Sequence, residues 1–153
     1  MRLPLLASSL ALVALGFTVS RGVPAAPAPV PFTVLAQGSF SGFSMQPDDV
    51  VVLRKSQFER LWAQHAGTTP PAVDFAQESV IAVFMGNMPT GGFSVSVAHV
   101  ETDGTQISVF VDNMSPGPKC NVIQVNTNPF VIVKVPKISL PVIFMHNPVN
   151  LAC

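Results

Sequence analysis

A short apolar run that ends in a loop of proline and glycine constrains the fold of this chain most strongly. Residues Val80 to Met85 form six consecutive apolar positions without a charge. This run is short for a helix and is rich in side chains that favour a buried, pleated surface. We therefore expect a central strand that is covered on both faces. The run ends at Gly86, and Pro89, Gly91 and Gly92 follow, which together predict an irregular loop.

The stretch after this loop alternates in polarity. Phe93, Val95 and Val97 are apolar, whereas Ser94 and Ser96 between them are polar. Such alternation is typical of a strand with one solvated face. Because the two segments are adjacent in sequence, we expect them to be antiparallel partners joined by the glycine loop.

The remaining pattern predicts an α+β, mostly β fold: an antiparallel sheet or sandwich of about seven strands with one short helix. Asp103-Gly104, between two alternating segments, predicts a hairpin turn. Asp48-Asp49 is interpreted as a solvated turn. The other expected strands are residues 32–35, 40–43, 50–53, 107–111, 122–125, 130–135 and 142–145.

The helix is expected between Ser56 and His65. Ser56 and Glu59 have the spacing of a capping box at its start, and Gly67 can close its end. Its apolar face contains Trp62, the only tryptophan, which we expect to anchor the helix on the sheet.

The beginning of the chain has the pattern of an export signal. An apolar stretch follows Arg2, and small residues follow that stretch, so residues 1–25 are interpreted as a cleaved signal peptide. The alternative is a retained membrane anchor, because the apolar stretch approaches the length of a spanning helix. Residues 26–31 are expected to be a stiff spacer rich in proline and alanine, and residues 32–153 a single domain.

The charge of the chain argues against several classes of partner. Without Arg2 and Arg21, six basic residues remain against eight acidic ones, and the basic residues are not clustered. Nucleic acid and stable membrane insertion after cleavage are therefore not expected. The expected location is outside the cytoplasm, either secreted or in the periplasm and cell envelope. In such an oxidising compartment Cys120 and Cys153 are expected to form a disulfide, the alternative being two free thiols.

Catalytic and metal-binding patterns are not found in the sequence. His65, His99 and His146 have no second ligand at a metal-binding spacing, and no serine lies in a nucleophile elbow. The glycine loop lacks the lysine of a phosphate-binding loop. We therefore expect a protein that is not an enzyme, with no catalytic residues, no metal and no cofactor.

The glycine loop is the candidate binding site. Fixed by strands at both ends, it can present a preformed surface to a protein partner, which lowers the entropic cost of docking. The alternative is a tight connection that needs glycine for its geometry alone. The candidate residues are Asn87, Met88, Pro89, Thr90, Gly91, Gly92 and Phe93.

Several segments resemble the PrcB C-terminal-domain-like family, the non-catalytic subunits of bacterial secreted protease complexes. The resemblance spans Leu61 to Lys137, and its most specific part is Pro89-Thr90-Gly91-Gly92-Phe93. It implies a secreted or anchored protein that assembles or stabilises a protease complex, with another exported protein such as a protease as its partner. The chain lacks the lipid-anchor cysteine of some members, so the identity of that partner does not carry over.

A second resemblance is to chagasin-type cysteine protease inhibitors. Asn87 to Phe93 is similar to their Asn-Pro-Thr-Thr-Gly-aromatic loop, which enters the active-site cleft of the protease. Here Met88 is inserted and Gly91 replaces the second threonine. The implied alternative function is inhibition through residues 87–93.

Overall fold

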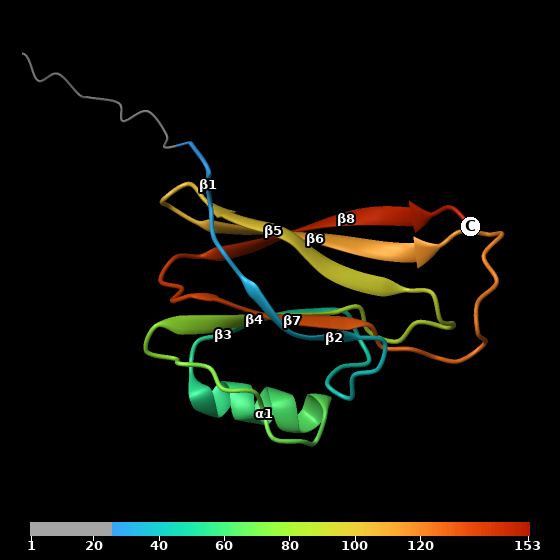
Figure 1. Cartoon of the computed structure of the whole chain (residues 1–153), viewed down its shortest axis with the longest axis horizontal. Coiled ribbons are helices and arrows are strands. Elements are labelled where there is room, and N and C mark those ends of the chain that lie inside the picture. The colour runs from blue at the N-terminus through green and yellow to red at the C-terminus, as the bar shows by residue number, and fades with distance from the viewer. Residues whose placement is uncertain (1–25) are drawn as a thin grey trace, which may run out of the picture.

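The computed structural model describes residues 26–153, which form two facing four-stranded sheets with one helix on the outer face of one sheet (Figure 1). One sheet has the order β1-β5-β6-β8 and the other the order β2-β7-β4-β3. The predicted mostly β sandwich with one short helix is confirmed, with eight strands in this part of the chain instead of about seven. The predicted signal peptide, residues 1–25, lies outside the described residues.

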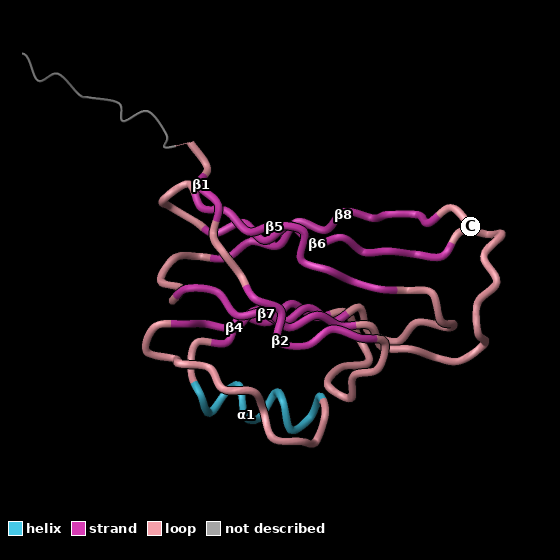
Figure 2. Tube along the Cα trace, viewed as in Figure 1, coloured by secondary structure: helices cyan, strands magenta, loops and turns pink. Residues whose placement is uncertain are grey.

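Three strands lie before the helix, of which β1 is only two residues long, and five lie after it (Figure 2). The elements are β1 (Ala28–Pro29), β2 (Thr33–Gly38), β3 (Asp48–Val52), α1 (Lys55–His65), β4 (Glu78–Phe84), β5 (Ser94–Thr102), β6 (Ile107–Pro116), β7 (Phe130–Pro136) and β8 (Val142–Leu151).

Strand β4 is the central strand that the apolar run predicts. It lies between β3 and β7, antiparallel to both, and every residue from Ser79 to Phe84 is buried. One of its faces meets the opposite sheet and the other meets α1, so both faces are apolar. This placement explains why the sequence reads as a continuous run and not as an alternation.

The expected pairing of β4 with β5 is wrong. β5 belongs to the other sheet, where it pairs with β1 and β6, so the glycine loop crosses from one sheet to the other. Burial of both faces of β4 requires a second sheet above it, and the alternating β5 supplies part of that sheet. The hairpin at Asp103-Gly104 is confirmed: β5 and β6 are antiparallel, and Gly104 has a positive φ of 86°.

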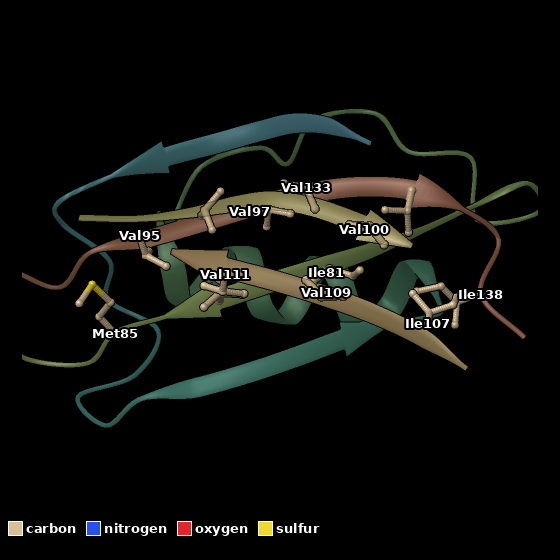
Figure 3. Packing of buried hydrophobic residues seen from close by; sticks show 13 residues of the cluster. Ile81, Met85, Val95, Val97, Val100, Ile107, Val109, Val111, Val133 and Ile138 are labelled. Carbon is tan, nitrogen blue, oxygen red and sulfur yellow. The ribbon is translucent and has the colours of Figure 1, made fainter. Parts of the chain in front are cut away.

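The main core lies between the two sheets and consists mostly of β-branched side chains (Figure 3). Ile81 and Val133 from one sheet face Val109 and Val111 from the other, and all four are almost completely buried. A second core lies between α1 and the outer face of the β2-β7-β4-β3 sheet. The domain is therefore three layers deep at the helix.

Helix α1 docks through Phe58, Leu61 and Trp62, as its apolar spacing predicts. The predicted capping box is wrong. The N-cap residue is Arg54, which makes no side-chain cap, and Ser56 lies inside the first turn. The side chain of Gln57 instead accepts a hydrogen bond from the Leu53 amide at 3.2 Å, which satisfies one group near the helix start.

Five other local predictions differ from the structure. Residues 40–43 and 122–125 are loops, and Asp48 and Asp49 begin β3 instead of forming a turn. Part of the expected spacer joins the sheet, because β1 pairs with β5 and Val30 packs against the core. The strand predicted at residues 142–145 extends to Leu151, lies at the edge of its sheet and pairs in parallel with β6.

Candidate functional site

The glycine loop lies at one end of the sandwich together with two other loops. Residues 39–47 connect β2 to β3, residues 85–93 connect β4 to β5, and residues 117–129 connect β6 to β7. In Figure 1 all three lie at the right-hand end, where β6 and β8 also end. We call this region the loop end.

Backbone hydrogen bonds join the three loops to one another. Met88 and Thr127 exchange two bonds, from the Met88 amide to the Thr127 carbonyl at 2.7 Å and from the Thr127 amide to the Met88 carbonyl at 2.9 Å. The Gly91 amide donates to the Ile123 carbonyl at 2.9 Å, and the Asn87 amide donates to the Met45 carbonyl at 3.0 Å. The loop end is therefore one connected surface and not three independent loops.

The glycines allow this close contact. A Cβ atom on Gly91 would lie 2.6 Å from Cγ1 of Ile123, and one on Gly92 would lie 2.8 Å from Cγ1 of Val122. Gly92 also has a φ of +85°, which side chains of L-residues rarely allow. Here the two glycines serve the packing of residues 85–93 against residues 117–129.

The side chains of the glycine loop divide into inward and outward groups. Met88 and Phe93 are partly buried and pack against the core between the sheets. The Thr90 hydroxyl donates to the carbonyl of Gly91 at 3.0 Å, and the Thr90 carbonyl accepts a bond of 2.8 Å from the Thr127 hydroxyl. Asn87, Pro89 and Gly92 are exposed.

Exposed apolar side chains surround this framework. Two come from the first loop and two from the third, and the sequence analysis assigned three of them to strands. They are Phe40 (64% exposed), Met45 (64%), Ile123 (63%) and Val125 (50%). The signal that could have separated residues 122–125 from a strand is the polar and proline-rich sequence around them, from Pro116 to Pro129.

A disulfide fixes one side of the loop end. Cys120 and Cys153 are joined, with their Cα atoms 5.0 Å apart. Beside them, the Gly117 amide donates to the Leu151 carbonyl at 3.1 Å. The expected pairing of the two cysteines is thus present, and it holds the beginning of the third loop against the end of β8.

A polar pair spans the open side of the sandwich next to the loop end. Nε2 of His146 on β8 lies 2.8 Å from Oδ2 of Asp49 on β3, and Nδ1 of His146 lies 3.1 Å from the side-chain amide nitrogen of Asn113. Behind them is a cleft of about 400 Å³ whose lining includes Met85 and Met88. The pair links the two sheet edges, and the cleft lining contains no serine, cysteine or lysine.

A serine of the first loop also meets the histidine at the end of α1. The Ser41 hydroxyl lies 2.8 Å from Nδ1 of His65, and its oxygen accepts a bond from the Phe43 amide at 3.1 Å. Burial against Trp62 and Phe130 lowers the pKa of His65, which favours the neutral ring. A catalytic triad also needs an acid on the other ring nitrogen, and the described residues supply no such hydrogen bond to His65.

Metal sites and membrane spans were sought in the same part of the chain. Among residues 26–153, no three histidine, cysteine or acidic side chains gather in an arrangement that could hold a metal ion. No helix within these residues has the length and apolar character needed to cross a bilayer. His99 stacks on Phe110, with ring centroids 4.0 Å apart, far from His65 and His146 in sequence.

Comparison with known proteins gives one match. Residues 79–136 match the family model described as PrcB C-terminal, which runs from the start of β4 to the end of β7 and includes the glycine loop and Cys120. This confirms the resemblance read from the sequence, over a shorter range that leaves out α1. No curated protein and no solved structure matches the chain.

Proposed function

Because residues 79–136 are similar to the PrcB C-terminal family, we propose that the chain is a non-catalytic, exported protein-binding domain. We further propose that it assembles or stabilises a secreted protease complex by binding another exported protein, such as the protease itself. The family supports the non-catalytic role, and the arrangement of the loop end supports protein binding.

The observation that carries this proposal is the set of four exposed apolar side chains on a preformed framework. Phe40, Met45, Ile123 and Val125 are each at least half exposed, although large apolar side chains are the ones most often buried. The hydrogen bonds among the three loops fix the backbone before any partner arrives. A preformed surface loses little conformational entropy on docking, so more of the apolar contact contributes to affinity.

In this proposal the glycine loop has two functions. Met88 and Phe93 anchor it in the core, while Asn87 and Pro89 face solvent beside the apolar side chains. Gly91 and Gly92 allow the third loop to pack closely against it, which places Ile123 at the surface. Residues 87–93 are therefore proposed as the support and polar border of the contact surface.

Two observations support a location outside the cytoplasm. Disulfides persist in oxidising compartments, and Cys120 and Cys153 are joined. The first 25 residues have the sequence pattern of a signal peptide. The described domain has no clustered basic surface residues in its sequence, so a protein partner fits it better than nucleic acid or an anionic membrane.

Affinity capture from culture fluid and cell envelope tests the contact surface. The informative pair of variants is Val125→Ser at the loop end and Val34→Ser on the edge strand β2. The same side chain is truncated in both, and it is 50% and 48% exposed respectively. We expect Val125→Ser and Ile123→Ser to lose a captured protein that Val34→Ser keeps, with each variant folded by circular dichroism. Equal capture by all three folded variants would exclude the loop end as the site.

An activity assay separates assembly from inhibition. A chagasin-type inhibitor blocks a papain-like cysteine protease when added in equimolar amount. An assembly subunit leaves that protease active and instead prolongs the lifetime of the protease with which it is captured. Inhibition of papain that is lost on replacing the exposed Pro89 would therefore replace the assembly proposal by the inhibitor alternative.

A further inference from the structure

Strand β8 is an unusually open sheet edge. It is ten residues long, Val142–Leu151, and carries no aspartate, glutamate, lysine or arginine. The other edge strands have features that hinder pairing with a foreign strand: β1 consists of two residues including Pro29, β2 has a bulge, and β3 begins with Asp48 and Asp49. Long uncharged edges are the ones that accept another strand.

The register with β6 determines which backbone groups of β8 face outward. The amide of Ile107 donates to the carbonyl of Pro141 at 2.8 Å, and Ile107 is opposite Val142 in the parallel pair. In a parallel ladder, alternate residues of a strand bond to the same neighbour. Ile143 and Met145 therefore bond to β6, whereas Val142, Phe144 and His146 direct their backbone groups to the open side.

Two prolines limit this open segment. Pro141 precedes β8, and Pro148 occupies the next outward position after His146, where it has no amide to donate. Between the two prolines, the backbone groups of three residues point to the open edge: Phe144 in the middle, with Val142 and His146 at equal spacing on either side.

We propose that β8 pairs with β8 of a second copy of this chain, antiparallel and about a two-fold axis at Phe144. In this register Phe144 exchanges two backbone hydrogen bonds with the partner's Phe144. Val142 then lies opposite the partner's His146, and the same pair recurs on the other side of the axis. The β1-β5-β6-β8 sheets of the two copies become one continuous sheet, and the two-fold axis closes the assembly at two subunits.

The side chains at this register favour self-pairing. Ile143 lies opposite the partner's Met145. The side chains of both residues lie on the solvent-exposed face of the sheet and are 39% and 47% exposed in the single chain. Apolar cross-strand pairs stabilise antiparallel strands, and two such pairs form in each dimer. Since the segment has no charged side chain, the two copies bring no like charges together. Phe110 on the neighbouring strand β6 is in register with Met145 and extends the apolar surface next to it.

The arrangement leaves both loop ends free. β8 runs toward the loop end of its own domain (Figure 1), so antiparallel pairing directs the two loop ends away from each other. The dimer is therefore bivalent, with one contact surface at each end. Two linked sites can raise apparent affinity for a partner that is itself multivalent.

Sedimentation equilibrium of the purified protein tests the proposal. We expect a dimer whose dissociation constant rises at least about tenfold in Met145→Lys, because a charge then lies opposite Ile143 on each side of the axis. The matched control is Val34→Lys, which places the same charge on the β2 edge at a residue that is 48% exposed. The control should leave the dissociation constant unchanged.

A charge-pair variant tests the register itself. In the double variant Ile143→Glu with Met145→Lys, opposite charges face one another across the axis, and dimerisation should recover relative to Met145→Lys alone. A wild type that stays monomeric at all concentrations overturns the proposal, even if it binds an extended segment of another protein. If Val34→Lys weakens the dimer as much as Met145→Lys does, or if the double variant does not dimerise better than Met145→Lys alone, the contact lies elsewhere. Either result also overturns the proposal.

Discussion

Trp62 lies on the buried face of α1, where its indole ring packs edge-on against Phe58 with ring centroids 5.6 Å apart. Its indole nitrogen donates to the Thr68 hydroxyl at 3.2 Å, so its polar group is satisfied. Ser56, earlier in the same helix, is exposed and caps nothing. At the scale of single residues, the helix therefore depends on the packing of its apolar face and not on a capping side chain.

Replacement of these two residues should have very different effects. Trp62→Ala leaves a cavity between α1 and the sheet and should lower the free energy of unfolding by about 3–5 kcal/mol. Ser56→Ala should change it by less than about 0.5 kcal/mol, because alanine is a better helix former and no hydrogen bond is lost. Urea titration measures both values. Similar small effects would contradict the burial of Trp62, and a loss near 1 kcal/mol in Ser56→Ala would restore the capping role.

At the scale of elements, the sequence predicts what each segment becomes more reliably than where it pairs. The apolar run of β4, the alternation of β5 and the Asp103-Gly104 turn are local patterns, and all three elements form. The partner of β4 is not a local property. Adjacency suggested β5, but β7, which lies far along the chain, occupies that position. β5 instead belongs to the second sheet, which covers the inner face of β4.

The candidate site was only partly predictable for the same reason. Residues 87–93 have a distinct local composition, and their position at a turn between strands follows from it. The exposed Phe40 and Ile123 resembled strand residues, because apolar side chains usually indicate burial. Their place at the surface depends on contacts between three loops that are far apart in sequence.

The glycine loop allows backbone strain to be separated from packing. Gly92 and Gly104 have nearly the same φ, +85° and +86°, but a Cβ on Gly92 meets Val122 and Pro116, whereas one on Gly104 meets nothing within 4 Å. Gly104→Ala should cost about 1–2 kcal/mol through the backbone alone. Gly92→Ala should cost measurably more, since the neighbouring loop must also move. Equal losses in thermal or urea unfolding would show that the two loops do not pack as described.

At the scale of the whole molecule, a disulfide ties the segment after β8 to the loop that follows β6. The disulfide joins the last residue, Cys153, to the loop between β6 and β7, across a sequence separation of 33. β8 is held to β6 along its full length by the parallel ladder, so the bond connects segments that already lie together. Its main effect is expected on the unfolded chain, whose freedom it restricts.

This argument predicts the size of the effect of removing the disulfide. The double variant Cys120→Ser with Cys153→Ser should lose about 3–4 kcal/mol of unfolding free energy, from the entropy of closing a loop of this length. Reduction of the wild type should give the same loss in urea titration, while the reductant leaves the double variant unchanged. Near-ultraviolet circular dichroism should stay native in both, because the core between the sheets does not include the cysteines. A double variant as stable as the oxidised wild type, or two thiols that label in denatured protein from the native host, would show that the bond does not form there.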